Sequence, residues 1–327
     1  MTKKSAAIYF AKTGRKILFI LLPFILFSCD KKISPQFQTS LGTVCFVNLY
    51  DDGKKSVYDE ISKRISGIDN EFNVNNDNSE ISNVNKNAKI SPVKVSDDFA
   101  FVLKTALEAA ELSDGDFNPA LGKLIKLWGI NTENAHVPKL PEIAEAKSHC
   151  DWKKIIFDEK NQMVFLDDEE MSLDFGAIAK GFAADEIAKI CRERNVRRAI
   201  IDLGGNVLAF GKKSENENWN VGIKNPDAPE SEVSKVVSIE EGSVVTSGNY
   251  ERYFIQDGKR YHHILDGKTG FPAESGLKSV TVICRKSIVA DALSTTFFVA
   301  GKEKSLRLKP LFEEKFGEKI ELYFIES

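Results

Sequence analysis

Strand-like segments crowd the second half of this sequence, and helical segments stand on both sides of them. Apolar, β-branched runs fill residues 199–203, much of 207–264 and 279–284, after a helical pattern over 177–194 and before another over 289–299. A doubly wound fold would instead alternate strand and helix along the whole chain. The order predicts an α+β fold, a single large domain with two lobes in which mixed and antiparallel sheets are flanked by helices.

The first half adds further elements. Apolar periodicity predicts a strand over 43–50 and helices over 54–72, 99–112 and 121–128. Two strand-like runs separated by a polar stretch predict a hairpin, and a segment dominated by Asn and Ser predicts a loop. The hairpin covers 155–157 and 163–166, the loop covers 73–87, and a last strand is predicted over 320–325.

The amino terminus carries an export signal. Five basic residues precede an apolar run over 17–27, which is too short to span a bilayer stably. Ser28 and Cys29 then resemble the end of a bacterial lipoprotein signal. We expect a signal peptide over 1–28, lipidation of Cys29, a flexible tether over 29–40 and a folded domain over 41–327. The alternative is an uncleaved amphipathic anchor, and the lipoprotein reading places the protein on the periplasmic face of the inner membrane.

Charge and cysteine content exclude several classes of site. The formal net charge is −3 with both signs interspersed, so no basic stripe marks a nucleic-acid groove. Cys45, Cys150, Cys191 and Cys284 are scattered without a close pair, so neither a zinc site nor a redox motif is present. A disulfide among these four remains open.

Glycine-rich and polar segments interrupt the predicted elements. At Gly176 a strand ends and a helix begins, and Lys180 follows one turn later, which suits a phosphate-bearing ligand or a plain strand-to-helix turn. The paired glycines of 202–207 lack dinucleotide-binding spacing and are interpreted as architectural. His262 and His263 are adjacent, so they point opposite ways along a strand and one of them can face a ligand. A structural histidine is the alternative.

Asp291 and Thr295 lie four residues apart in a predicted helix, so their side chains share one face. Carboxylate and hydroxyl oxygens are hard donors that suit Mg²⁺ or Ca²⁺, and Mg²⁺ usually accompanies phosphate chemistry. A solvated pair or a hydroxyl bonded back to the helix is the alternative. The spacing alone therefore indicates a candidate metal site.

Taken together and in this order, the segments resemble the ApbE family, the FAD:protein FMN transferases. The resemblance runs from about residue 41 to residue 301, and it implies the fold of that family, which is related to the T-fold. The segments that carry it are 41–43, 79–82, 116–119, 127–129, 174–181, 202–206, 246–248, 263–266, 269–270 and 290–295.

The resemblance implies an enzyme that splits FAD and attaches FMN by a phosphoester bond to a Thr or Ser hydroxyl of a target protein, with release of AMP. The implied partners are FAD and exported flavoprotein subunits of membrane electron-transport complexes. The implied metal is Mg²⁺, held by the carbonyl of Ala177 and the side chains of Asp291 and Thr295. The implied catalytic residues are Lys180, His263 and Asp291. The implied flavin-binding residues are Leu41, Asn75, Asp116, Phe117, Asn118, Asp174, Lys180, His263 and Ile264.

Two positions depart from the family pattern. Asn118 stands where the family commonly has aspartate, which is expected to weaken or re-aim one flavin contact. Asn75 lies in an Asn-rich loop where many relatives carry an aromatic residue that covers the cofactor. Loss of this cover would admit water, so FAD hydrolysis to FMN and AMP is an alternative activity. A non-catalytic flavin-binding lipoprotein is a second alternative, and it would not need Asp291.

Overall fold

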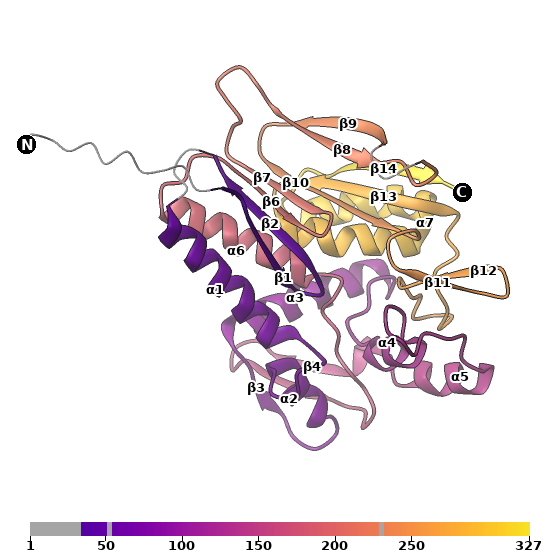
Figure 1. Ribbon diagram of the computed structural model, residues 1–327. Helices are drawn as coiled ribbons and strands as arrows, with labels where there is room; N and C mark the ends of the chain where they lie inside the picture. The colour runs from indigo at the N-terminus through magenta and orange to yellow at the C-terminus, as the bar shows by residue number, and fades with distance from the viewer. Residues whose placement is uncertain (1–33, 51–53, 229–231) are drawn as a thin grey trace, which may run out of the picture. The chain divides into compact units, whose positions relative to one another are not determined.

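A seven-stranded antiparallel sheet organises the fold (Figure 1). The computed structural model describes residues 34–50, 54–228 and 232–327, and the described residues belong to one compact unit. The predicted signal peptide and Cys29 lie outside the described residues. In order across the sheet, the strands are β1 (Gln36–Ser40), β2 (Thr43–Leu49), β6 (Ala199–Leu203), β7 (Asn206–Phe210), β10 (Gly242–Gly248), β13 (Leu277–Cys284) and β14 (Glu321–Glu326).

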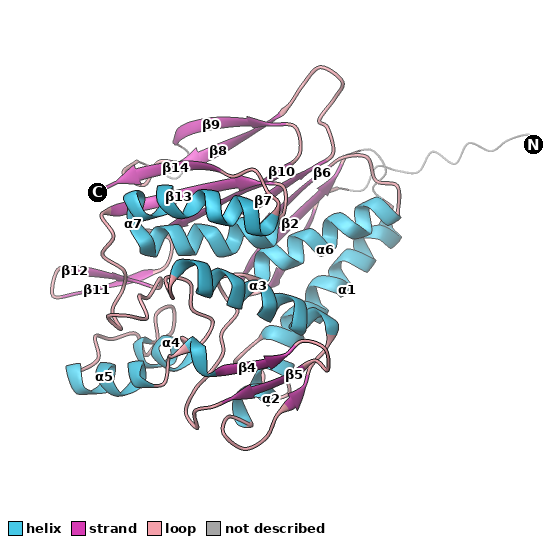
Figure 2. Ribbon diagram, turned by 180° about the vertical axis from the view of Figure 1, so that it is seen from behind, coloured by secondary structure: helices cyan, strands magenta, loops and turns pink. Residues whose placement is uncertain are grey.

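Long helices cover one face of this sheet, as Figure 2 shows from behind. They are α1 (Lys55–Phe72), α6 (Ala179–Glu193) and α7 (Ser287–Phe316), and α3 (Asp97–Ser113) packs against α7. Alternate residues of β2, namely Cys45, Val47 and Leu49, are buried beneath the helices, whereas Val44 is exposed. One apolar core between helices and sheet therefore holds the elements that carry the candidate site.

Smaller units surround this core. A short sheet contains β3 (Val93–Lys94), β5 (Met163–Leu166) and β4 (Ile155–Asp158). A second apolar cluster joins α4 (Gly122–Trp128) and α5 (Leu140–Ser148) to the segment around Leu265. The remaining elements are α2 (Glu80–Lys86), the 3₁₀ turn Trp152–Lys154, the hairpin of β8 (Trp219–Lys224) and β9 (Val233–Ile239), and the hairpin of β11 (Tyr253–Gln256) and β12 (Lys259–His262).

The α+β prediction and the 155–166 hairpin are confirmed, and Phe157 faces Val164 across that hairpin. The loop predicted over 73–87 is wrong for its second half, because α2 occupies Glu80–Lys86. The hydroxyl of Ser79 accepts the amide of Ser82 at 3.1 Å and caps this helix. Its apolar residues are buried in the main core, so tertiary packing outweighs an Asn-rich composition.

The predicted tether is wrong for its last five residues, because Gln36–Ser40 form strand β1. This strand pairs with β2 through a two-residue turn at Leu41 and Gly42, whose φ angles of 53° and 66° are those of a type I′ hairpin. Ladder hydrogen bonds join backbones, so a polar segment without apolar periodicity still forms an edge strand.

The final helix is longer than the predicted 289–299, and a break at Gly301, with φ 75° and ψ 167°, divides it. The four cysteines that the structure describes are free and buried. Within residues 34–50, 54–228 and 232–327, no helix is both long and apolar enough to cross a membrane.

Candidate active site

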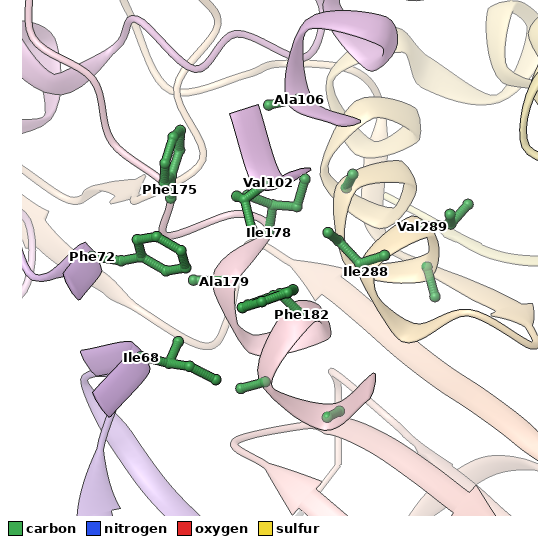
Figure 3. Close-up of a cluster of buried hydrophobic side chains, with 14 of the residues drawn as sticks. Ile68, Phe72, Val102, Ala106, Phe175, Ile178, Ala179, Phe182, Ile288 and Val289 are labelled. Carbon is green, nitrogen blue, oxygen red and sulfur yellow. The ribbon is translucent and has the colours of Figure 1, made fainter. Parts of the chain in front are cut away.

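The first turn of α6 and the first turns of α7 meet in a close crossing. The amide of Gly181 donates to Oδ2 of Asp291 at 2.8 Å, although the two residues are 110 positions apart in the chain. A Cβ atom at position 181 would lie 2.4 Å from the carbonyl oxygen of Ser287, so only glycine allows this approach. Figure 3 shows Ile178 and Phe182 at the start of α6 in one apolar cluster with Ile288 of α7.

The carbonyl of Ala177 lies just before α6. Ile178 is the N-cap residue, with a non-helical φ of −144°, and Gly181 is the third residue of the helix. The Gly181 amide has no partner within the helix, and it bonds Asp291 of α7. Within the described part of the chain, no donor forms a hydrogen bond with the Ala177 carbonyl. The turn therefore presents an unpartnered carbonyl at Ala177, four residues before the amide that bonds Asp291.

Asp291 and Thr295 supply oxygen atoms from α7. Asp291 is 3% exposed, and its Oδ1 lies 3.4 Å from Nζ of Lys180, which also donates to the carbonyl of Gly176 at 3.2 Å. The Thr295 hydroxyl lies 3.4 Å from the hydroxyl of Ser247 on β10. A carboxylate, a hydroxyl and a free carbonyl form a set of hard oxygen donors, which fits Mg²⁺ or Ca²⁺. The residues present therefore fit the metal that the sequence implied.

The glycine turn is also tied to the 116–119 segment. The amide of Asp174 donates to the carbonyl of Pro119 at 2.9 Å, and the carboxylate of Asp174 accepts the amide of Gly176 at 2.7 Å. Burial raises the pKa of Asp174, while the Gly176 amide and Lys180 oppose this shift. Asp174 thus shapes the turn at Gly176, in addition to any contact it makes with a ligand.

His263 contacts Arg252 through two groups. Its amide and its Nδ1 both lie in hydrogen-bond distance of the Arg252 carbonyl, at 3.0 and 3.2 Å, so Nδ1 carries the proton and Nε2 is left as an acceptor. The guanidinium of Arg252 donates to the carbonyl of Gly42 at 2.9 Å, which brings the predicted flavin residues Leu41 and His263 into one region. Ile264, the next residue, is buried in the main core.

The two adjacent histidines are both held neutral. Burial, followed by the charge of Arg252, lowers the pKa of His263 from 6.5 to about 3. Burial also lowers the pKa of His262, whose Nε2 contacts the carbonyl of Ala273 at 3.1 Å and whose ring meets Phe298 edge-on. An uncharged His263 suits a neutral hydrogen-bonding role.

These arrangements match a known family. A sequence model of the ApbE family matches residues 41–314, a span that includes the glycine turn, both histidines and the α7 carboxylate. The chain belongs to the ApbE family.

Curated relatives and solved structures agree with this. An FAD:protein FMN transferase of Treponema pallidum is 38% identical over 285 residues, which cover 82% of this chain and 79% of the relative. One of Klebsiella pneumoniae is 36% identical over 277 residues, covering 84% and 85%. A crystal structure of the ApbE protein of Thermotoga maritima superposes with a TM-score of 0.79 at 34% identity, covering 89% of this chain and 94% of that one.

Two of the predicted flavin residues of this ApbE chain direct their side chains into the protein. Phe117 is 3% exposed and lies in the main core. Asp116 forms ion pairs with Lys268 at 2.7 Å and Lys304 at 2.5 Å. Phe117 can therefore contact a ligand only through its backbone. Asp116 can contact a ligand only through a carboxylate that two lysines already pair.

The departure at Asn118 has a structural explanation. Its Nδ2 donates to the carbonyl of Cys150 at 2.8 Å, and its Oδ1 accepts the amide of Ala120 at 2.8 Å. An amide side chain satisfies both partners, whereas an ionised carboxylate would face the Cys150 carbonyl without a proton to donate. Asn118 therefore fits this packing, rather than merely weakening a flavin contact.

Asn75 lies exposed in the turn between α1 and α2. Its amide donates to Oδ1 of Asn73 at 2.9 Å, an Asx turn typical of Asn-rich loops. Residues 73–79 contain no aromatic side chain. The turn therefore offers no ring of its own to cover a bound flavin.

Sequence reasoning missed some of the residues that build this site. Arg252, which joins His263 to the β1–β2 turn, carried no signal beyond its place beside Tyr253. Ser247 entered the sequence analysis only as part of segment 246–248, yet its Oγ lies 3.4 Å from the hydroxyl of Thr295 and 2.9 Å from that of Ser294. Both contacts join segments far apart in the chain, and no local pattern encodes such pairs.

A second group of metal-ligand side chains lies on the surface. Glu145, His149 and Glu170 bring three ligand atoms within 4.8 Å of one another. Lys123 forms ion pairs with both glutamates, and Asp168 holds Nδ1 of His149 at 2.5 Å. Lys123 already supplies positive charge there, so the group forms an ion-pair network on the surface.

Proposed function

We propose that this chain is a Mg²⁺-dependent FAD:protein FMN transferase that attaches FMN to a Thr or Ser hydroxyl of exported flavoproteins and releases AMP. One observation carries the proposal: the Gly181 amide bonds the carboxylate of Asp291, which joins the start of α6, just after Ala177, to the oxygen donors of α7. The names of the Treponema and Klebsiella relatives support the same activity.

The reaction would transfer the FMN group of FAD from AMP to the acceptor hydroxyl. The acceptor hydroxyl oxygen forms a bond to the phosphorus on the riboflavin side of FAD and loses its proton, while the bond from that phosphorus to the AMP oxygen breaks. Such a step depends on positioning and on neutralising phosphate charge. Mg²⁺ held by Ala177, Asp291 and Thr295 would supply the positive charge that neutralises the phosphates.

The chain's own residues have separate tasks in this scheme. Lys180 places a fixed positive charge 3.4 Å from the Asp291 carboxylate, where it opposes phosphate charge. Neutral His263, with Nδ1–H held by Arg252, offers Nε2 as an acceptor that orients a substrate hydroxyl. The Gly176 turn presents backbone groups at the start of α6, where phosphate is favoured.

The neutral state of His263 predicts a specific pH dependence of stability. Because the folded pKa is depressed from 6.5 to about 3, the unfolded chain binds one more proton in between, and this contribution to stability is lost as pH falls below 6.5. Relative to His263→Gln, the wild type should lose about 1.4 kcal/mol of unfolding free energy per pH unit below about pH 6. Urea unfolding of both proteins at several pH values measures this difference. A difference that does not change with pH would contradict a neutral, partly buried His263.

We also propose a location. The basic-then-apolar amino terminus that ends at Cys29 supports a lipid anchor on the periplasmic face of the inner membrane. A tethered enzyme would share that compartment with exported acceptor subunits of membrane electron-transport complexes. Radiolabelled palmitate incorporation that is lost in Cys29→Ala would support the anchor, and equal labelling of both would contradict it.

Transfer is tested by mass spectrometry. Purified protein, FAD and Mg²⁺ are incubated with a candidate acceptor domain. We expect the acceptor to gain the mass of one FMN less one water, on a single Thr or Ser, with one AMP released for each adduct. Acceptor without added mass, under conditions where the Klebsiella relative modifies it, would contradict the proposal.

The open Asn75 turn favours a second candidate activity, FAD hydrolysis with water as acceptor. In the same assay without acceptor protein, this activity would release AMP and FMN in equal amounts. Absence of AMP would remove the idea. FAD binding without either product would instead indicate a non-catalytic flavin carrier.

A further inference from the structure

The helices that form the candidate metal site cap one another. The residue before α6 is Ile178 and the residue before α7 is Lys286, and neither side chain caps its own helix. Asp291 of α7 accepts the Gly181 amide in the first turn of α6. Asp185 of α6 accepts the amides of Ser287 and Ile288, the first two residues of α7, at 2.9 Å each.

The spacing of these contacts makes the arrangement reciprocal. Gly181 and Asp185 are four residues apart on α6, and Ser287 and Asp291 are four residues apart on α7, so each pair lies on one helix face. Position 181 meets position 291, and position 185 meets position 287, so the helices run antiparallel through the crossing. Two carboxylates, one from each helix, thus fix the position of α6 relative to α7 along the helix axes, at two successive turns.

We propose that Asp185 is a positioning residue of the metal site, which holds Asp291 and Thr295 at the height of the Ala177 carbonyl through the amino end of α7. This inference rests on the proposed function and deepens it. Asp291 alone cannot fix the crossing, because a carboxylate that must also face a cation has one oxygen left for Gly181. The Asp185 contacts lie one turn away from the donor set and use no oxygen of Asp291.

Asp185→Asn is the test variant. An amide keeps the shape but offers only one acceptor oxygen, so one α7 amide faces an NH₂ group and loses its bond. We expect the dissociation constant for Mn²⁺, measured by electron paramagnetic resonance on the protein alone, to rise about three- to tenfold. The Mg²⁺ concentration for half-maximal transfer should rise by the same factor, while kcat at saturating Mg²⁺ stays within about twofold.

Ser96→Ala is the matched control. The Ser96 hydroxyl accepts the amide of Phe99 at 3.1 Å and caps α3, so this variant also loses a helix cap, but away from the α6–α7 crossing. It should lower Tm and leave the Mn²⁺ constant unchanged. Equal Mn²⁺ affinity in wild type and Asp185→Asn would overturn the inference, as would an equal loss of affinity in Ser96→Ala.

A measurement on the wild type covers the case in which Asp185→Asn does not fold. Mg²⁺ should slow hydrogen exchange at the amides of Gly181, Ser287 and Ile288 together, and slowing at Gly181 alone would overturn the coupling. The two proposals also fail separately. If the wild type transfers FMN and Asp185→Asn binds Mn²⁺ as tightly as the wild type, only the positioning role is removed. If Asp185→Asn binds Mn²⁺ more weakly but the wild type shows no transfer, only the proposed function is removed.

Discussion

Asp291→Ala is expected to reduce FMN transfer by about 10²- to 10³-fold, because it removes the charged member of the metal donor set. FAD binding should largely survive, since the flavin-binding segments predicted around Leu41, Asp116 and His263 lie on other elements. Rates are measured by mass spectrometry of the acceptor, and FAD affinity by quenching of flavin fluorescence in the presence of a chelator.

Two further variants separate charge from folding. Asp291→Ala also leaves the Gly181 amide without its acceptor, which costs about 1–3 kcal/mol of stability. Asp291→Asn keeps an acceptor oxygen for that amide and removes the charge, so it should lose transfer with a smaller fall in Tm. Asp158→Ala removes a comparable carboxylate-to-amide contact, to Asn161 at 3.1 Å, in a distant turn and should retain full transfer.

The outcome distinguishes the candidate functions. A transfer rate of Asp291→Ala within tenfold of wild type would contradict the assigned metal site. If transfer and FAD affinity fell in parallel, Asp291 would serve FAD binding rather than the chemical step. If the wild type bound FAD without forming either product, the chain would be a flavin carrier and the variant would have no rate to lose.

Local patterns predicted the parts of the site that lie within one element. The four-residue spacing of Asp291 and Thr295 placed both on one face of a helix, and the structure has both on α7. The paired glycines were interpreted as architectural, and Gly204 and Gly205 have φ angles of 65° and 89° in the two-residue turn between β6 and β7. Both predictions rest on helix periodicity or turn chemistry, which neighbouring residues determine.

Local patterns do not encode contacts between distant segments, although the family resemblance implied that Ala177 and Asp291 share one metal. Nothing near Gly181 indicates that its amide bonds a carboxylate 110 residues away. The low pKa of His263 likewise depends on burial and on Arg252, which the fold brings beside it. Element boundaries failed for the same reason, because α2 and β1 are stabilised by packing and pairing rather than by their own composition.

Gly181→Ala is expected to destabilise the protein by about 2–3 kcal/mol and to lower Tm by roughly 4–10 °C. A Cβ at position 181 would lie 2.4 Å from the Ser287 carbonyl oxygen, 2.7 Å from Cβ of Asp291 and 2.7 Å from Cα of Ile288. Two of these three atoms are backbone, so the clash cannot be relieved by turning a flexible side chain. The helices must separate, and the metal donors must separate with them.

Gly67→Ala is the matched control, because helix propensity alone predicts the same sign for both substitutions. Gly67 lies inside α1 with no neighbouring atom within 4 Å of its added Cβ, so alanine there should stabilise by about 0.5–1 kcal/mol. Thermal and urea unfolding of the two variants measure the contrast. Destabilisation by Gly181→Ala together with stabilisation by Gly67→Ala would establish that α6 and α7 touch in solution as closely as the candidate metal site requires. Stabilisation by both substitutions would show a looser crossing, in which Ala177 and Asp291 lie too far apart to share one cation.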